Sequence, residues 1–506
     1  MNKETFIIIG AGIGGLATAC LLAKKGHKVI VVEKNEQAGG RAGLIVGKST
    51  KGDFIFDKGP SWYMMPDVFE EFYKLIGEDI HKHLKLKQLS PSYRVFMEDS
   101  QKSYDFFGDI QKTADVFEGI EKGSGNKLVD FLKKVKYQYE VAKGEFMYKN
   151  YDSIFDFFNW RVMTIGSKLP IFKKQSTIIN KIFKDDVIRK VMQYQTVLLG
   201  TSPYETPGIY TLMNYVDFGL GVWYPEGGIY EIIKSLHKIA TDNGVEFKFN
   251  SPVKKILTKE NSAYGVLLED NSEITGDRVI SNADYEHTEK MLLNNDQREH
   301  DDKYWEKRTL APSAFIIYLG IDGKIPNIQH HNLVFSKNWK ENFDQIFKSP
   351  SWPDKPSMYI CAPSVTDKTV APENTENLFV LVPIAPGLYS KESEKEKYYE
   401  FIIERLCSVF DAKDLKERIL YKKIYTVEDF EKDYNSYKGS ALGLAHTLMQ
   451  TAVWRPNNAS KKVKNLYFVG ANVNPGIGMP ICLISAILAY KRIFNIKDNI
   501  PPKTLD

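Results

Sequence analysis

The sequence predicts an α/β fold built around a dinucleotide-binding strand–turn–helix–strand unit. An apolar run over residues 5–9 precedes a glycine-rich turn, a helical pattern covers 16–25, and a β-branched run over 28–32 closes with Glu33. A second uncharged stretch, 465–490, is interrupted by prolines and glycines, so it predicts another buried strand–turn–helix unit rather than a membrane span. A chain of 506 residues has room for a further domain and an enclosed ligand.

Composition excludes several classes of protein. Hydrophobic residues make up 43 % and charged residues 26 %, which excludes a disordered chain, a collagen-like fibre and a polytopic membrane protein. A net charge of +4 gives no indication of nucleic-acid binding. The four cysteines lie far apart without a CxxC pair, which argues against a zinc ribbon or a thioredoxin-like motif and fits a reducing compartment. No cleavable signal is visible, so we expect a cytoplasmic protein.

Hydrophobic patterning predicts the other main elements. We expect helices over 228–242, 392–410 and 481–492, and strands over 253–258, 263–269, 272–275, 278–281, 314–320, 378–383 and 466–469.

The first glycine-rich turn predicts where a dinucleotide binds. Gly10 permits the tight turn, Gly12 lets the backbone approach a pyrophosphate, and Gly15 lets the helix pack against the strand, with Gly14 between them. The helix N-terminus then offers N–H groups to the phosphates. Glu33 is placed to accept hydrogen bonds from ribose hydroxyls, which disfavours the 2′-phosphate of NADP.

A second glycine turn follows within ten residues of Glu33 and contains Gly40 and Arg41. An arginine so near the phosphate site predicts further neutralisation of a diphosphate. The run Asp-Lys-Gly-Pro-Ser follows at 57–61. Together these motifs resemble the FAD-binding flavoproteins that include amine oxidases, protoporphyrinogen oxidase and carotenoid desaturases. The resemblance implies that Arg41 contacts FAD and that Gly59, Pro60 and Ser61 lie under the flavin.

Further segments resemble the bacterial-type phytoene desaturases, over nearly the whole chain from 5 to 494. They are the Thr-Ser-Pro-Tyr run at 201–204, Trp-Tyr-Pro-Glu-Gly-Gly at 223–228, the segment 277–284 and the glycine-rich segment 465–480. The last segment departs from the residues usual in that family at Asn472, Val473, Asn474 and Ile477.

The resemblance implies the rest of an FAD site. Val253 is expected to contact the adenine through its backbone, and Gly470, Asn472, Gly478 and Met479 are expected near the flavin. A helix that begins in the last of these turns would favour negative charge on the reduced flavin and so make the flavin a better hydride acceptor.

The predicted fold is therefore a Rossmann-type FAD-binding domain with an inserted α+β substrate domain and a helical, membrane-associating subdomain. We expect the FAD-binding domain at 1–85, 220–300 and 440–506, the substrate domain at 86–110, 200–219 and 301–439, and the helical subdomain at 111–199.

The helical subdomain contains an unusually basic and aromatic segment, 122–190. It holds thirteen Lys and two Arg against seven acidic residues, a net charge of +8. Basic residues interleaved with large apolar ones are typical of a surface that lies in a membrane interface, although a solvated basic subdomain has the same composition. The large apolar residues are Tyr148, Tyr151, Phe155, Phe157, Phe158, Trp160, Phe172, Ile178, Ile179, Ile182 and Phe183.

The expected activity is FAD-dependent introduction of double bonds into phytoene or a related carotenoid precursor, by hydride transfer to flavin. Only one dinucleotide unit is visible, so we expect no nicotinamide and a quinone or oxygen as electron acceptor. No catalytic residue is assigned: Glu226 is the first carboxylate to test as proton acceptor, but a solvated glutamate remains open. His330 and His331 are expected to form a surface pair.

Two other classes of function remain open on the sequence alone. One is different redox chemistry on the same fold, as in a polyene saturase, a carotenoid oxygenase or an amine oxidase. The other is a non-catalytic lipid carrier like the prenyl-protein escort proteins, against which the intact glycine turn and Glu33 argue.

Overall fold

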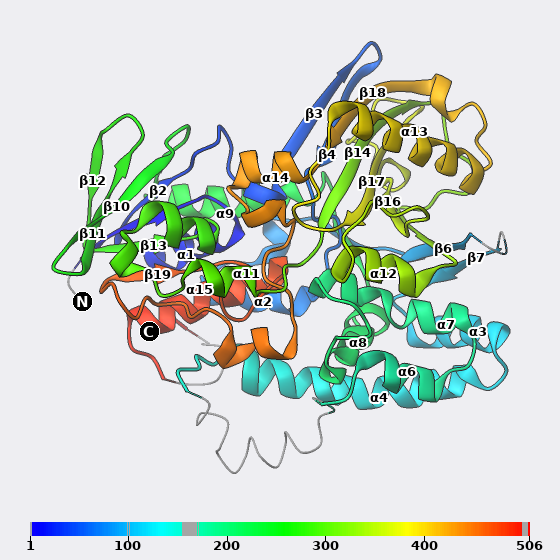
Figure 1. Cartoon of the computed structure of the whole chain (residues 1–506), viewed down its shortest axis with the longest axis horizontal. Coiled ribbons are helices and arrows are strands. Elements are labelled where there is room, and N and C mark those ends of the chain that lie inside the picture. The colour runs from blue at the N-terminus through cyan, green and yellow to red at the C-terminus, as the bar shows by residue number, and fades with distance from the viewer. Residues whose placement is uncertain are drawn as a thin grey trace.

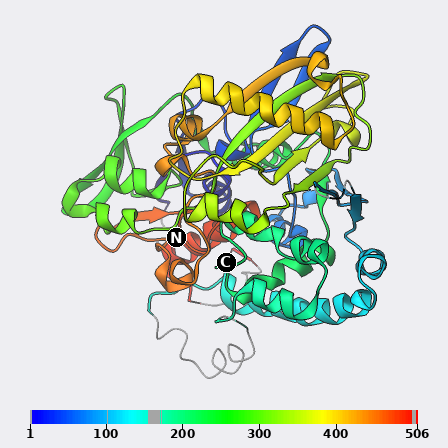
Figure 2. The same cartoon turned by 45° about the vertical axis from the view of Figure 1, so that its right-hand side comes forward.

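The computed structural model describes residues 3–98, 100, 102–153, 170, 172–497 and 504–505. Two large sheets lie at opposite ends of the molecule, and a group of helices lies below the second sheet (Figure 1). The same arrangement is visible after a turn of 45° (Figure 2). No helix within the described ranges is both long and apolar enough to cross a membrane.

The first sheet has five parallel strands in the order β19-β13-β1-β2-β9. They are β1 (Thr5–Ile9), β2 (Lys28–Val32), β9 (Glu246–Lys248), β13 (Arg278–Ser281) and β19 (Leu466–Phe468). Four of the five residues of β1 are buried because both faces of the sheet are covered. The helices α1 (Ile13–Lys24), α9 (Tyr230–Asp242) and α15 (Met479–Ile493) pack on one face with Phe6 and Ile8, whereas Ile7 and Ile9 pack in a separate cluster on the other face. An antiparallel sheet of β10 (Val253–Lys259), β11 (Ser262–Leu268) and β12 (Glu273–Thr275) packs beside it.

The second sheet has seven strands in the order β18-β14-β17-β16-β15-β6-β7, and only β15 and β6 run parallel. Its strands are β6 (Tyr93–Met97), β7 (Lys102–Phe106), β14 (Ser313–Asp322), β15 (His331–Phe335), β16 (Met358–Cys361), β17 (Thr375–Ile384) and β18 (Ile419–Tyr425).

Strand β14, which lies between β18 and β17, is buried on both faces, and this explains its largely apolar sequence. Ile317 and Leu319 pack with α13 (Glu392–Val409), whereas Ile316 and Tyr318 pack with Phe54 of the hairpin β3 (Leu44–Ser49)–β4 (Gly52–Asp57). This hairpin follows β2 of the first sheet in sequence, but it packs on the second sheet. A short pair, β5 (Leu86–Gln88) with β8 (Trp223–Pro225), adds a further connection.

Helices fill the space around the two sheets. The helical group is formed by α3 (Ile110–Ile120), α4 (Ser124–Val141), α6 (Gln175–Ile182), α7 (Asp186–Val191) and α8 (Met213–Phe218). The remaining helices are α2 (Pro66–Leu75), α10 (Tyr285–His287), α11 (Asp302–Glu306), α12 (Trp339–Phe347) and α14 (Val427–Tyr434). At its end α4 continues into a π-helical turn, Ala142–Met147.

The elements expected from the sequence all occur. The strands at 5–9, 28–32 and 278–281 have the expected bounds, and the two uncharged stretches are strand–turn–helix units. The helix α1 begins three residues earlier than expected, because Gly14 and Gly15 already belong to it, and α15 begins two residues earlier, at Met479. Short strands at 44–57, 93–97, 331–335 and 358–361 were not predicted.

Candidate functional site

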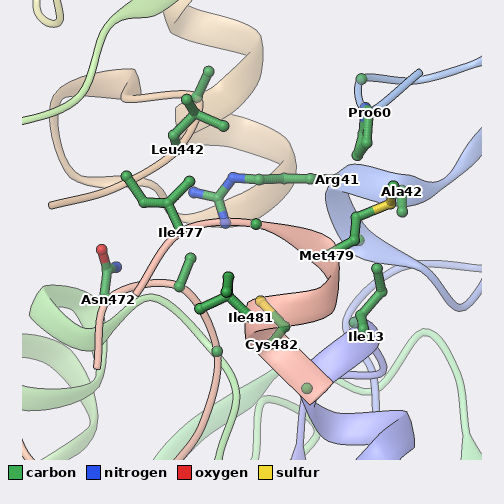
Figure 3. A pocket seen from close by; sticks show the side chains of 18 of the residues that line it. Ile13, Arg41, Ala42, Pro60, Leu442, Asn472, Ile477, Met479, Ile481 and Cys482 are labelled. Atoms are coloured by element: carbon green, nitrogen blue, oxygen red, sulfur yellow. The ribbon is translucent and has the colours of Figure 1, made fainter. Parts of the chain in front are cut away.

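One cavity of about 830 Å³ lies between the two sheets and the helical group. All of the predicted cofactor-binding residues except Gly15 line it, although they come from distant parts of the chain. Figure 3 shows part of this cavity, with Arg41 and Pro60 on one side and the first turn of α15 below them. The cavity also reaches residues of β14, β15, β17 and α12 in the second sheet's half of the molecule.

The turn between β1 and α1 has the geometry that a phosphate needs. Gly10 has a φ of +94°, in the region that favours glycine. Gly12 caps α1, and no side chain bonds the first N–H groups of this helix. A Cβ on Gly12 or Gly14 would lie 2.8 or 2.6 Å from the Asn282 side chain. Asn282, which follows β13, therefore fits tightly against the turn and leaves the helix N-terminus to a ligand.

Gly15 is buried and has a packing role. A Cβ on it would lie 2.1 Å from the carbonyl oxygen of Gly10, far inside van der Waals contact. Only glycine allows α1 to approach β1 this closely, as the sequence argument predicted.

Glu33 lies at the end of β2 with its side chain buried on the cavity wall. Its Oε2 accepts a hydrogen bond from the Ala11 N–H (2.8 Å) and its Oε1 accepts one from the Asn35 N–H (3.0 Å). Val253 lines the same end of the cavity, beside Ser251 and Pro252. The carboxylate is thus held in a fixed position on the cavity wall that Val253 also lines.

Arg41 lies on the opposite side of the turn, in the short helix η1 (Gly40–Ala42). Its Nη2 donates to the Ser436 hydroxyl (3.0 Å), and its guanidinium lies 5.5 Å from the centre of the Tyr434 ring. Its Nε is buried and has no hydrogen-bond partner. A guanidinium on the cavity wall with a buried, unpaired Nε and no acidic partner among the described ion pairs fits an anionic diphosphate.

The Gly59–Pro60 turn is anchored by Asp57. The Asp57 carboxylate accepts hydrogen bonds from the N–H groups of Ile229 (2.9 Å) and Tyr230 (3.0 Å) and so caps α9. Burial raises the pKa of this carboxyl to about 7. One side chain therefore joins the two motifs at 57–61 and 223–228, which lie more than 160 residues apart in sequence.

The C-terminal turn is held by polar contacts on both sides. Asn472 donates from Nδ2 to Asp284 Oδ2 (2.8 Å) and accepts at Oδ1 from the Leu444 N–H (3.0 Å). Burial raises the pKa of Asp284. Gly478, with a φ of +125°, caps α15, and no side chain bonds the first N–H groups of this helix. The positive end of α15 therefore faces the cavity, as expected.

Arg455 supports this turn from beneath. Its buried guanidinium donates to four carbonyl oxygens, those of Ala471 (2.6 Å), Leu444 (2.9 Å), Gln450 (3.1 Å) and Val473 (3.2 Å). Burial lowers the pKa of Arg455 to about 10, so it remains charged at neutral pH.

His446 holds the turn from a second side. The Ile477 N–H donates to its Nε2 (3.0 Å), so the neutral ring carries its proton on Nδ1, 2.7 Å from the Tyr210 hydroxyl. Burial holds the pKa of His446 well below its usual range, which keeps this ring neutral.

Most of the rest of the cavity wall is apolar. It is lined by side chains of the helical group and of the second sheet, among them Leu198, Ile209, Met213, Leu333, Phe335 and Phe343. Three residues of the π-helical turn after α4, Ala142, Phe146 and Met147, complete this part. The cavity therefore joins an end lined by the predicted cofactor-binding residues to a mainly apolar end.

Glu226 does not lie in this cavity. Its side chain is 53 % exposed and lies 3.8 Å from Lys85. Glu226 is therefore a solvated glutamate, the alternative that the sequence left open, and it is not placed to accept a proton from a molecule in the cavity.

The expectation that His330 and His331 form a surface pair is wrong. Both are buried, with His331 stacked on Trp62 at 4.4 Å between ring centres and His330 edge-on to Tyr224. Burial lowers the pKa of His330 to about 3, because a charged imidazolium would lose its hydration there. Together with Cys361, the two histidines form the one cluster of three potential metal-ligating side chains in the described part of the chain. Burial raises the pKa of the Cys361 thiol to about 12, which opposes the thiolate that a metal needs.

Four site residues were not assigned a role from the sequence: Asn282, Asp284, His446 and Arg455. Asn282 and Asp284 fall in the recognised segment 277–284, so a polar pair directly after a buried strand was the available signal. His446 and Arg455 lie in no motif, and only the folded chain brings them under the C-terminal turn.

Comparison with known proteins agrees with this geometry. Residues 13–493 match the family described as flavin containing amine oxidoreductase. The chain therefore belongs to this family of flavoproteins.

The curated relatives place it more narrowly. The chain is 41 % identical over 488 residues to the carotenoid 3,4-desaturase of Haloarcula japonica, with 96 % of this chain and 97 % of the relative covered. It is 33 % identical over 490 residues to the zeta-carotene-forming phytoene desaturase of Myxococcus xanthus, covering 96 % and 93 %. It is 32 % identical over 489 residues to a 4,4′-diapophytoene desaturase of Staphylococcus haemolyticus, covering 95 % and 96 %. Within the family its place is with the carotenoid desaturases.

Solved structures show the same fold at low identity. An oxidoreductase from Methanosarcina mazei superimposes with a TM-score of 0.61 at 18 % identity, covering 96 % of this chain and 99 % of the other. A putrescine oxidase superimposes with a TM-score of 0.62 at 13 % identity, covering 98 % and 99 %.

The contact at Gly15 predicts a loss of cofactor on enlargement of this residue. In Gly15→Ala the added methyl group would clash with the Gly10 carbonyl, so α1 must shift away from β1 and the purified protein should carry little flavin. Gly119→Ala is the matched control, because Gly119 lies in α3 with nothing within 4 Å of an added Cβ. The control should keep its flavin and gain up to about 1 kcal/mol of stability. Flavin absorbance per protein measures the loading of each variant. Equal loading of the two variants would contradict the packing role of Gly15.

Proposed function

We propose that this protein is an FAD-dependent carotenoid desaturase that introduces double bonds into phytoene or a related carotenoid precursor. The observation that carries the proposal is the single cavity that joins the dinucleotide residues to a long apolar wall. The chemical names of the relatives, all carotenoid desaturases, support the same class of substrate.

The residues present fit FAD at the polar end of the cavity. Glu33 would hold the ribose of the adenosine half, with Val253 beside the adenine. The uncapped N-terminus of α1 and the free Nε of Arg41 would bind the diphosphate. The ribityl chain and the isoalloxazine ring of the flavin would then lie near Pro60, Gly478 and Met479, which line the cavity. When bound, the flavin supplies the acceptor for a hydride from an allylic C–H bond.

The apolar wall of the cavity would bind and position the substrate. It would orient an extended hydrocarbon, exclude water from the reacting carbons, and keep them next to the C-terminal turn. Ile477, whose backbone N–H is fixed by His446, lines the cavity at this turn. The uncapped N-terminus of α15 would favour negative charge in its direction.

We further propose that a membrane quinone or oxygen receives the electrons, and that no nicotinamide takes part. A lipid-soluble substrate makes a lipid-soluble acceptor a natural partner. The sequence contains one glycine-rich dinucleotide turn followed by an acidic residue, so a second dinucleotide has no sequence support.

The third part of the proposal is a cytoplasmic protein that binds peripherally to membranes through part of 122–190. Phe172 is 91 % exposed, beside the exposed lysine Lys173. Outside that segment, Met449 and Trp454 are 57 % and 40 % exposed on a loop whose Thr451 lines the cavity. Exposed apolar side chains near the substrate cavity suit an enzyme whose substrate dissolves in lipid.

Not all of the basic residues serve such a surface. Lys143 makes ion pairs with Asp67 (2.5 Å) and Glu71 (2.7 Å), and Lys190 is buried 2.8 Å from Asp186. These two lysines hold the fold together. Four of the aromatic residues that suggested the surface, Phe155, Phe157, Phe158 and Trp160, lie outside the described residues.

The desaturase proposal predicts oxidation of a polyene without nicotinamide. Mixed anaerobically with phytoene or its shorter-chain analogue in liposomes, flavin-loaded protein should lose its flavin absorbance while a longer conjugated product appears. Added quinone should restore turnover. Coexpression in a host that accumulates phytoene provides a second measurement, by product analysis. A stoichiometric requirement for NADH or NADPH would mean a reduction or mono-oxygenation and would contradict the proposal.

The ribose role of Glu33 predicts a loss of flavin affinity in Glu33→Arg. The change removes charge-assisted hydrogen bonds of about 1.5–3 kcal/mol each, so affinity should fall at least about tenfold. Glu36→Arg is the control, because it makes the same charge change three residues on, at an exposed position outside the cavity. Titration of the flavin-free proteins with FAD measures both. Unchanged affinity in Glu33→Arg would refute the ribose assignment.

The membrane proposal predicts flotation with anionic liposomes that weakens at high salt. Each Lys or Arg near an anionic surface contributes about 1 kcal/mol, and salt screens this attraction. Phe172→Ser should reduce the bound fraction, whereas Val365→Ser, which changes an exposed side chain on the second sheet's side, should not. Equal recovery in the soluble fraction with anionic and neutral liposomes at every salt concentration would rule out the surface.

A further inference from the structure

We infer that Tyr194 is the catalytic residue that accepts the proton lost by the substrate, and that Asp217 is the positioning residue that receives this proton from Tyr194. The inference rests on the proposed desaturation. It assigns the proton acceptor, which neither the motifs nor Glu226 supply.

Asp217 is a fully buried carboxylate on α8 without a cationic partner in the described chain. Its Oδ2 accepts three hydrogen bonds, from the hydroxyls of Tyr93 (2.9 Å) and Tyr194 (2.9 Å) and from Gln195 Nε2 (2.8 Å). Its Oδ1 has no partner. A buried carboxylate held only by neutral donors is costly to keep ionised, so its presence calls for a functional reason.

Burial also makes this carboxyl a better base. It raises the pKa of Asp217 to about 6, and the hydrogen bonds from Gln195, Tyr194 and Tyr93 oppose the rise. The group is therefore ionised at neutral pH but closer to the range in which a general base is effective.

Tyr194 connects this carboxylate to the cavity. Tyr194 is one of the residues that line the cavity, whereas Tyr93, Gln195 and Asp217 do not line it. Its ring lies 6.2 Å from that of Trp62, which follows the Gly59–Pro60 turn. Tyr194 therefore stands between the cavity and a buried negative charge.

The segment that begins with Tyr194 reaches the other turn of the site. In η5 (Tyr194–Leu199), Leu199 accepts a hydrogen bond at its carbonyl from the His446 N–H (3.1 Å). A Cβ on the next residue, Gly200, would lie 3.2 Å from Ile477 Cδ1. The segment thus runs from the Gly–Pro turn to the C-terminal turn, the two turns between which the substrate must be oxidised.

The chemistry of desaturation requires such a group. An allylic C–H bond breaks and its hydride leaves to the flavin, so the substrate becomes a delocalised cation. A C–H bond on the adjacent carbon then breaks: its proton goes to the Tyr194 oxygen, and its electron pair becomes the new C=C bond. The Tyr194 hydroxyl proton passes to Asp217 at the same time, so the tyrosine stays neutral and the carboxyl ends protonated. Before this transfer, the unpaired carboxylate stabilises the cation electrostatically.

The pair of tyrosines provides a matched test. Tyr194→Phe and Tyr93→Phe each remove one hydroxyl and one hydrogen bond to the same Asp217 oxygen, but only Tyr194 lines the cavity. In flavin-loaded protein, Tyr194→Phe should lower kcat about 100-fold, as for loss of a general base, with KM within about threefold. Tyr93→Phe should stay within about threefold of wild type in both. Equal losses in the two variants, or wild-type kcat in Tyr194→Phe, would overturn the inference.

A binding measurement tests the charge without turnover. An ammonium analogue of the polyene, with nitrogen in place of the cationic carbon, should bind Asp217→Asn about tenfold more weakly than wild type, while the uncharged hydrocarbon binds both equally. Equal binding of the ammonium analogue would overturn the role of Asp217. If wild-type protein leaves the polyene unchanged, the proposed function fails and the inference with it. If wild type turns over and the tyrosine variants match, only the inference fails.

Discussion

The close contact between α1 and β1 determines where the rest of the site can lie. Because Gly15 has no side chain, the helix lies directly against the Gly10 carbonyl. Asn282, at the end of β13, then fits against Gly12, Gly14 and Gly470, so the ends of three parallel strands meet at one side chain. A ligand held at this edge lies at the carboxyl ends of the strands, where open α/β sheets bind their nucleotides.

The polar groups around the cavity fall into two kinds. Some, such as Arg41 and the uncapped helix N-termini, keep unused donors that face a ligand. Others, such as Arg455 and His446, form hydrogen bonds with the backbone of the C-terminal turn and fix its shape. The division explains how a turn of glycines and prolines can be rigid enough to form one wall of a reaction site.

How far the sequence predicts this structure depends on the range of the contacts involved. The unit from β1 to Glu33 was predictable because each residue acts on near neighbours along the chain. The short strands β6, β15 and β16 were missed, since their pairing with distant strands decides them. His330 and His331 were misplaced because adjacent polar residues suggest a surface, whereas both are buried, His331 stacked on Trp62 and His330 edge-on to Tyr224. Asp217 gave no signal, as its three donors come from β6 and η5.

The order of strands in the first sheet has a consequence for how the protein is made. Strand β19 and helix α15 come from residues 466–493, yet β19 completes the sheet beside β13, and α15 packs on α1 near the start of the chain. During synthesis the N-terminal half emerges and begins to fold first. The glycine turn after β1 therefore forms long before residues 466–493, which line the other side of the cavity, have left the ribosome. We therefore expect a cofactor to bind only after residues 466–493 have folded, because a chain that ends before them lacks one wall of the cavity.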